Sequence, residues 1–220
     1  MITVHHLNNS RSQRVLWLLE ELGVAYEVKR YERDAKTMLA PQALKAVHPL
    51  GKSPVITDGA LTIAETGAIV EYLIENYGGG RLIPPAGSPE RLRYTYWMHY
   101  AEGSAMPPLV MKLIFREIPK QVPFFLRPVA RALFGGVTKS YVDPAIAEQV
   151  AFWAAELAKT PYFAGEALSG ADIMMSFPLE AAQMRGDLPP MLTGYLAGIQ
   201  GRPAYQRALE RGGPYMLMGG

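Results

Sequence analysis

The residues best suited to chemistry lie in the segment 48–66, which reads HPLGKSPVITDGALTIAET. Proline has no amide hydrogen to give to a sheet, so Pro54 before the apolar Val55 is expected at a sheet edge, at the first residue of a strand or in a turn. The Ser53–Pro54 bond, between a Gly-Lys turn and this strand, is a candidate cis peptide bond. The proline leaves the backbone N–H and C=O of Ser53 available to a partner outside the protein.

The same segment ends with a carboxylate and a hydroxyl where a helix is expected to begin. Glu65 and Thr66 precede apolar residues at helical spacing, and the first N–H groups of a helix have no partner within it. Such N–H groups bind anions. Together with Ser53, this pair predicts a site for a small peptide-like ligand that carries an α-carboxylate.

Composition narrows the class of protein. The 220 residues are 49% hydrophobic, which is enough for a sizeable core in one or two domains. The net charge of +2 implies no strong attraction to nucleic acid. Because the chain has no cysteine, we expect a cytoplasmic protein whose thiol chemistry comes from a substrate. We expect no signal peptide, and no apolar run approaches the roughly 20 residues of a membrane span.

Strand-like and helical patterns alternate through the first eighty residues. Strands are expected at 2–7, 25–31, 55–57 and 61–63, and helices at 11–23, in a short stretch ending near 47, and along 69–77. Asp58 and Gly59 lie between the last two strands and form a strong hairpin signal.

After a glycine-rich break at 78–80 and a proline-rich linker, only helical patterns follow. They cover 89–117, 138–159, 169–183, 190–198 and 203–211. The third of these begins with Ser169 and has Asp172 at its fourth place. This is the pattern of a capping box, and its role is structural.

An apolar segment with two arginines lies between the first two helical stretches. Residues 123–135 read PFFLRPVARALFG. We expect this segment to pack as an insertion on the body of the protein. The alternative is contact with a membrane surface, which its mixture of apolar and basic residues also suits.

The order of strands and helices, the candidate cis-proline and the helical second half resemble a cytosolic glutathione S-transferase. The resemblance covers essentially the whole chain, and its most specific parts are residues 52–54, residues 65–66 and the capping box at Ser169. Residues 97–111, WMHYAEGSAMPPLVM, further resemble a fungal and bacterial branch of the family.

This resemblance implies an α/β thioredoxin-like domain at 1–80 that binds glutathione, a linker at 81–89, and an all-α domain at 90–220 that carries the electrophile pocket. It also implies a homodimer that uses glutathione as co-substrate and needs no metal.

The resemblance also assigns the binding roles by position. The backbone of Ser53, next to Pro54, would pair with the cysteinyl unit of glutathione. Glu65 would hold the γ-glutamyl ammonium, and Thr66 the adjacent carboxylate. Lys52 would face the glycyl carboxylate. Considered alone, Lys52 could be an exposed turn residue, and Glu65 and Thr66 could form an ordinary helix start. The occurrence of all three together with the candidate cis-proline favours a binding site.

The group that activates the thiol has two main candidates. In this family a Tyr, Ser or Cys near the end of the first strand has this role, and residues 7–14 read LNNSRSQR, with neither Tyr nor Cys. By its spacing before Arg14, Ser10 resembles the serine of the theta-like classes. Asn9 is the alternative, because an amide N–H can also donate to a thiolate. Ser12 is better explained as a helix-start residue.

A hydroxyl donor is energetically sufficient for this role. A free thiol has a pKa near 8.5, and lowering it by one or two units requires roughly 1.4–2.7 kcal/mol. A hydrogen bond to a charged group contributes about 1.5–3 kcal/mol. Ser10 could therefore act without a general base, aided by the helix N-terminus and by Arg11.

The electrophile pocket is expected along the first helix after the linker. Residues at i, i+4 spacing share a helix face, and aromatic and methionine side chains suit broad apolar ligands. This face consists of Tyr94, Met98, Glu102 and Met106, with Trp97 and Ala101 beside it. The same stripe also fits core packing.

These features predict a detoxification enzyme that binds glutathione, stabilises its thiolate and conjugates it to a hydrophobic electrophile. The alternatives are a glutathione-dependent peroxidase, isomerase or dehalogenase on the same scaffold, and a non-catalytic glutathione-binding protein. His5 and His6 have no metal-ligand partners at useful spacing and are expected to be structural.

Overall fold

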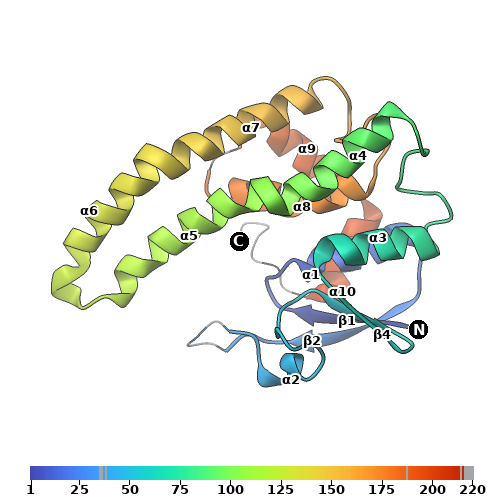
Figure 1. Cartoon of the computed structure of the whole chain (residues 1–220), viewed down its shortest axis with the longest axis horizontal. Helices are drawn as coiled ribbons and strands as arrows, with labels where there is room; N and C mark the ends of the chain where they lie inside the picture. The colour runs from blue at the N-terminus through green and yellow to red at the C-terminus, as the bar shows by residue number, and fades with distance from the viewer. Residues whose placement is uncertain (35–36, 38, 187, 214, 216–220) are drawn as a thin grey trace.

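The computed structural model describes residues 1–34, 37, 39–186, 188–213 and 215. Its first part contains a mixed sheet with the strand order β2-β1-β3-β4 (Figure 1). The strands are β1 (Ile2–Leu7), β2 (Tyr26–Tyr31), β3 (Val55–Asp58) and β4 (Leu61–Ala64). β1 is parallel to β2 and antiparallel to β3, which forms the expected hairpin with β4.

Helices follow these strands and fill the second half of the chain. The helices that accompany the sheet are α1 (Ser12–Leu22), α2 (Gln42–Lys45) and α3 (Thr66–Tyr77). Those after the linker are α4 (Pro89–Tyr100), α5 (Met106–Gln121), α6 (Arg127–Val137), α7 (Asp143–Leu157), α8 (Gly170–Gln183), α9 (Pro190–Gln200) and α10 (Pro203–Gly212). The π-helical turns η1 (Ala101–Ala105) and η3 (Thr138–Val142) join α4 to α5 and α6 to α7, and the 3₁₀ turn η2 (Phe124–Leu126) precedes α6.

The two faces of the sheet are covered by different helices. Successive side chains of a strand point to opposite faces, so Ile2 and Val4 of β1 share one face and Leu7 lies on the other. Ile2 and Val4 join the main core together with α1 and α3, which pack against each other. Leu7 packs with Tyr31 of β2 and Leu44 of α2 in a separate small cluster. The predicted α/β part is confirmed.

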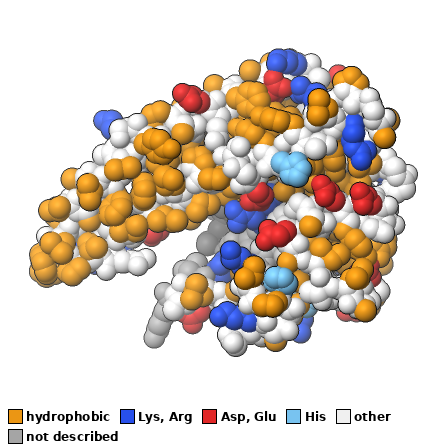
Figure 2. Space-filling model, viewed as in Figure 1, with side chains coloured by type: hydrophobic (Ala, Val, Ile, Leu, Met, Phe, Trp, Pro, Cys, Tyr) orange, Lys and Arg blue, Asp and Glu red, His pale blue; other side chains and the backbone are white. Residues whose placement is uncertain are grey.

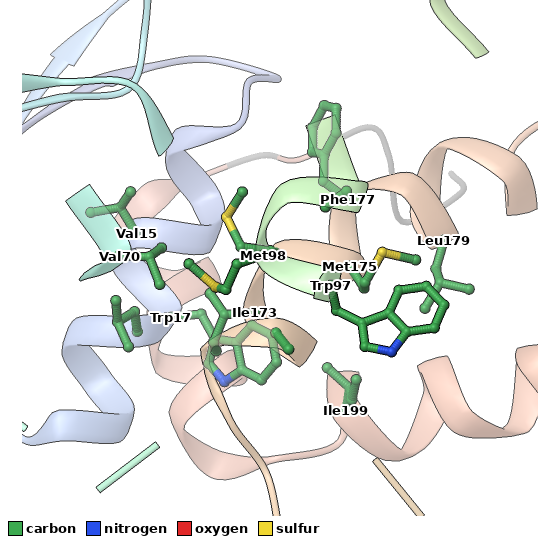
Figure 3. Packing of buried hydrophobic residues seen from close by; sticks show 14 of the residues in the cluster. Val15, Trp17, Val70, Trp97, Met98, Ile173, Met175, Phe177, Leu179 and Ile199 are labelled. Carbon is green, nitrogen blue, oxygen red and sulfur yellow. The ribbon is translucent and has the colours of Figure 1, made fainter. Parts of the chain in front are cut away.

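Helix α8 lies at the centre of the core. Its residues from Gly170 to Ala182 are all buried, and it contacts α1, α3, α4 and α9. Figure 3 shows Ile173 of α8 beside Trp17 of α1, and Met175 of α8 near Trp97 of α4. The sheet-bearing part and the helical part therefore share one hydrophobic core.

The predicted capping box begins α8. The hydroxyl of Ser169 accepts the N–H of Ala171 at 3.3 Å, and one carboxylate oxygen of Asp172 accepts the N–H of Ser169 at 2.8 Å. The other oxygen accepts the N–H of Phe163 and the hydroxyl of Tyr195. Burial raises the pKa of Asp172, and these hydrogen bonds oppose the shift. The cap therefore anchors two neighbouring segments as well as its own helix.

Helices α5 and α6 form an arm that extends away from the body (Figure 1). Within the arm, the rings of Phe115 and Phe134 lie 5.4 Å apart. No residue of α6 is buried, and Phe124 and Phe125 in η2 are 78% and 66% exposed. The expectation that residues 123–135 pack on the body is therefore wrong, because α5 carries them beyond it. Among the described residues, no helix has the length and apolar character needed to cross a membrane.

Candidate active site

A cavity of about 250 Å³ lies between the Ser53–Pro54 turn, the start of α3 and the turn η1. Its wall contains all the residues that we expected to hold a tripeptide, together with Arg11 and Glu102. The lining residues are Arg11, His48, Leu50, Lys52, Ser53, Pro54, Ala64, Glu65, Thr66 and Glu102. Charged groups of both signs therefore converge on a space of small-molecule size.

The turn that enters β3 is held against β1 by the side chain of Ser53. The Ser53–Pro54 peptide bond is cis. The hydroxyl of Ser53 donates to the carbonyl of His5 at 3.2 Å and accepts the N–H of Leu7 at 3.4 Å. These bonds place Ser53 at the cavity wall beside the end of the first strand.

The N-terminus of α3 forms another part of the wall. Glu65 occupies the N-cap position with a φ of 70°, a conformation that costs about 1–3 kcal/mol for a residue other than glycine. Its side chain makes no capping hydrogen bond, and the first turn of α3 contains no acidic residue. The first N–H groups of α3 can therefore bind an anion, next to the hydroxyl of Thr66.

The carboxylate of Glu102 binds two arginines beside this cavity. Arg11 donates to it at 3.1 Å, and Arg14 forms a second ion pair. The buried Arg14 also donates to the carbonyl of Met174 at 2.6 Å and to the hydroxyl of Thr66 at 3.4 Å. Burial lowers the pKa of Arg14, and Glu102 opposes that shift. Burial disfavours the Glu102 carboxylate too, but Arg14 and Arg11 hold its pKa below the usual range.

The network around Glu102 was not predicted from the sequence. We placed Glu102 in an electrophile pocket and used Arg14 only for its spacing from Ser10. A signal was present, because cations are unfavourable near the positive N-terminus of a helix. Arg11 and Arg14 at the start of α1 therefore require a carboxylate from elsewhere. The π-helical turn η1 supplies Glu102, and such turns are frequent at functional sites.

Hydroxyl groups form a chain behind the cavity. The hydroxyl of Ser10 donates to that of Ser53 at 3.3 Å and lies 2.7 Å from that of Ser12. The hydroxyl of Ser12 in turn lies 2.8 Å from Nδ1 of His6. Burial lowers the pKa of His6 to about 4, despite a hydrogen bond to the backbone of Gly212. His6 is therefore neutral at pH 7.

Asn9 lies on a different cavity from the one that contains Ser53. It has a φ of 49°, in the left-handed region that Asn tolerates better than most residues. The cavity that it lines has a volume of about 190 Å³ and also contains His6, Tyr31 and Gly212. Ser10, in contrast, connects directly to Ser53.

An apolar groove of about 360 Å³ adjoins the cavity and follows α5. Arg11 and Glu102 belong to both walls. The groove is lined by Arg11, Glu102, Met106, Pro107, Val110, Met111, Ile114 and Phe115. We did not predict Val110 and Ile114, although they continue the i, i+4 series from Met106. Met98 lines a third cavity, of about 250 Å³, with Glu65, Thr66 and Glu102.

Tyr94 lies in the core and lines neither the groove nor the cavity beside Ser53. It is 3% exposed, and Trp97 and Ala101 are equally buried. An α-helix has 3.6 residues per turn, so each i, i+4 step rotates a side chain by about 40°. Two steps separate Tyr94 from Glu102, which turns Tyr94 away from the site by about 80°.

Comparisons with known proteins agree with this geometry. The family models for the N-terminal and C-terminal domains of glutathione S-transferase match residues 1–75 and 118–196. Glutathione S-transferase 3 of Schizosaccharomyces pombe is 38% identical over 184 residues, covering 83% of this chain and 75% of that protein. The chain belongs to the glutathione S-transferase family.

Solved structures of glutathione S-transferases match nearly the whole chain. The crystal structure of a glutathione S-transferase from Actinobacillus pleuropneumoniae is 32% identical, with a TM-score of 0.82, and covers 100% of this chain and 97% of that one. The theta class glutathione S-transferase from Xanthomonas axonopodis pv. citri, with glutathione bound, is 30% identical, with a TM-score of 0.70 over 94% of this chain and 96% of that one. The protein is a glutathione S-transferase with a thioredoxin-like N-terminal part and an all-α C-terminal part.

This glutathione S-transferase also has a larger cavity, of about 670 Å³, whose wall contains none of the residues that line the cavity beside Ser53. It lies between the linker residues 80–85 and the loop 164–169. One acidic wall residue, Glu21, is already paired with Arg202 at 2.6 Å. A site is identified by convergent polar groups as well as by volume, so we place the chemistry at the smaller cavity beside Ser53.

Proposed function

We propose that this enzyme binds glutathione beside Ser53, stabilises its thiolate with Ser10, and conjugates the sulfur to a hydrophobic electrophile in the groove along α5. The observation that carries the proposal is the convergence of Lys52, Glu65 and the open helix N-terminus at Thr66 on one cavity. Glutathione has two carboxylates and one ammonium, and these groups complement them. The glutathione-bound theta class relative supports the same ligand here.

Each part of glutathione has a proposed partner. Glu65 takes the γ-glutamyl ammonium, and Thr66 with the start of α3 takes the adjacent carboxylate. Lys52 faces the glycyl carboxylate. The backbone of Ser53, before Pro54, pairs with the cysteinyl unit. This assignment gives residues 1–80 the glutathione-binding role, followed by a linker at 81–89 and a helical domain at 90–220 that carries the electrophile.

Ser10 is the proposed donor to the thiolate. Its hydroxyl already reaches that of Ser53 at 3.3 Å, so it lies beside the residue assigned to the cysteinyl unit. The thiol proton leaves to solvent, and the hydroxyl hydrogen turns from Ser53 to the sulfur. The thiolate then forms the bond to carbon, and the leaving group departs with the electron pair. The Arg11 guanidinium, held by Glu102, adds positive charge at the cavity wall.

The apolar groove supports a hydrophobic second substrate. Met106, Met111 and Phe115 offer adaptable and aromatic contact surface at the edge of the cavity. Turnover of a chloro-dinitrobenzene and of cumene hydroperoxide separates conjugation from peroxide reduction. Faster turnover of the hydroperoxide would replace the conjugation proposal with a peroxidase.

Titration of the bound thiol tests the role of Ser10. We expect wild-type protein to lower the pKa of the glutathione thiol by about one to two units from 8.5. Ser10→Ala should return most of that shift while glutathione still binds in calorimetry. Thiolate absorbance against pH measures the pKa, and Asn9→Ala is the matched variant.

The outcomes of this titration separate the alternatives. A normal titration in Ser10→Ala together with a raised pKa in Asn9→Ala would transfer the role to Asn9. Binding without any thiol shift in the wild type would indicate a non-catalytic glutathione-binding protein. Absence of glutathione binding would refute every glutathione-dependent function.

A homodimer in the cytoplasm is part of the proposal. An exposed aromatic patch on α4 and α7 offers the contact: Tyr96 is 48% exposed and Phe152 36%. Their rings pack with those of Trp97 and Tyr100 at centroid distances between 5.2 and 5.8 Å. Aromatic residues are enriched at interfaces, and a stable contact buries about 1,200 Å² or more. Light scattering of Tyr96→Ser should show a monomer, whereas an unchanged dimer mass would place the contact elsewhere.

A further inference from the structure

The arm ends in a surface made of large apolar side chains. The turn η2, which we call the arm tip (residues 124–126), exposes 78% of Phe124, 66% of Phe125 and 46% of Leu126. The apolar series continues along one face of α6 at i, i+4 spacing, through Val129, Leu133 and Val137, which are 67%, 63% and 39% exposed. Figure 2 shows hydrophobic side chains gathered along the arm and at its end. Contiguous apolar surface of this kind marks an interaction site.

These side chains do not serve the core. Neither the arm tip nor α6 contains a buried residue. The contact between α6 and α5 rests on other positions, including the Phe115–Phe134 ring pair. Phe124, Phe125, Val129 and Leu133 are each more than 60% exposed, so polar side chains there would lose little packing. A binding partner explains why these positions are apolar.

The charge of the arm differs in sign from that of the remaining chain. In the part of the arm beyond Lys112, residues 113–138 contain four basic and one acidic side chain, a net charge of +3. The rest of the chain has 18 basic and 19 acidic residues, a net charge of −1. The acidic residue of the arm, Glu117, is paired with Arg116 and Lys120, and Arg127 and Arg131 of α6 add two further positive charges. The partner should therefore be apolar and anionic.

We infer that the arm docks the enzyme on the surface of a bilayer that contains anionic lipid. Phenylalanine side chains at the tip enter the boundary between headgroups and acyl chains, and the apolar stripe of α6 lies along it. The arginines and Lys120 contact anionic headgroups. Docking in this way is peripheral.

A second copy of the chain is the less suitable occupant. A symmetric contact would place two arms against each other, and each carries +3. An arm-to-body contact would be heterologous and would extend into an open chain of molecules unless its rotation closed into a ring. A bilayer that contains anionic lipid offers both apolar and negatively charged groups. Binding to it brings no second positively charged arm close and forms no open chain of molecules.

Sedimentation of the full-length protein with lipid vesicles tests this inference. We expect binding to vesicles of phosphatidylcholine mixed with phosphatidylglycerol, weaker binding to phosphatidylcholine alone, and a decrease with salt. The double variant Phe124→Ser/Phe125→Ser should bind at least about tenfold more weakly. Arg116→Gln/Arg131→Gln should lose about fivefold for each charge removed. Leu39→Ser is the matched control, because Leu39 is 67% exposed on the body, and should bind like the wild type.

The inference does not depend on glutathione, so its failure is distinct from failure of the proposed function. Circular dichroism and glutathione binding of each variant confirm that the fold is intact. Wild-type protein that stays in solution with anionic vesicles would overturn the inference, as would equal sedimentation of the serine variant. Light scattering adds one more outcome: self-association abolished by the serine variant, without vesicle binding, would make the arm a contact between copies instead.

Discussion

Replacing Glu102 by glutamine removes the charge that balances two arginines. Arg14 has only 1% of its side chain exposed, whereas Glu102 has 33% exposed. Loss of one partner from a buried ion pair costs about 3–5 kcal/mol, because the other charge stays buried without compensation. Exposure of Glu102 reduces this figure through solvent screening, and the glutamine oxygen still accepts a hydrogen bond. We therefore expect Glu102→Gln to lower the free energy of unfolding by about 2 kcal/mol.

Urea unfolding followed by tryptophan fluorescence measures this change, and calorimetry should show a melting temperature about 4–8 °C lower for a chain of this size. The matched control is Glu148→Gln, since Glu148 lies exposed on α7 and should change stability by less than about 0.5 kcal/mol. Glutathione should also bind less tightly to Glu102→Gln, because Arg14 connects Glu102 to Thr66. If Glu102→Gln unfolds at the same urea concentration as Glu148→Gln, the ion-pair reasoning is refuted.

Two further predictions concern His6 and the cap of α8. Burial lowers the pKa of His6 from 6.5 to about 4, so between these values the unfolded chain binds a proton that the folded protein does not. Stability should therefore fall by about 1.6 kcal/mol between pH 6.5 and 5. His6→Asn should show a smaller fall in its urea midpoint over this range, and equal falls in the two proteins would contradict the lowered pKa of His6. Ser169→Ala should lower the free energy of unfolding by about 1 kcal/mol, because the cap of α8 is lost. The control is Ser140→Ala, at an exposed position. Equal urea midpoints for the two variants would show that the cap does not stabilise the protein.

Elements specified by local chemistry were predictable from the sequence. The hairpin follows from Asp58 and Gly59, and the start of α8 follows from Ser169 and Asp172. Local chemistry also explains why helix α6 was missed: Pro128 and the glycine pair at 135–136 are poor helix formers. Proline is tolerated in the first turn of a helix, where its missing N–H has no partner to lose.

Part of the candidate site could likewise be predicted from local sequence, and part of it could not. Lys52, Ser53, Glu65 and Thr66 lie within one short segment, so their types and order were enough to group them. The pairing of Arg14 with Glu102 spans 88 positions in sequence. Glu102 lies in the π-helical turn η1, and residue spacing alone contains no sign of that turn. The chain of hydroxyls to His6 likewise depends on how α1 meets β1.

The central position of α8 determines how the protein would behave if its chain were divided into two fragments. A fragment that stops at the linker would contain the complete sheet, yet Trp17 of α1 would lose its cover from α8 and from Tyr205 of α10, whose ring centroid lies 5.4 Å away. We expect neither half to be soluble when expressed alone. Coexpressed as separate polypeptides, the two halves should recover glutathione binding by assembling around α8, because the cut falls in an exposed connection and leaves the shared core intact.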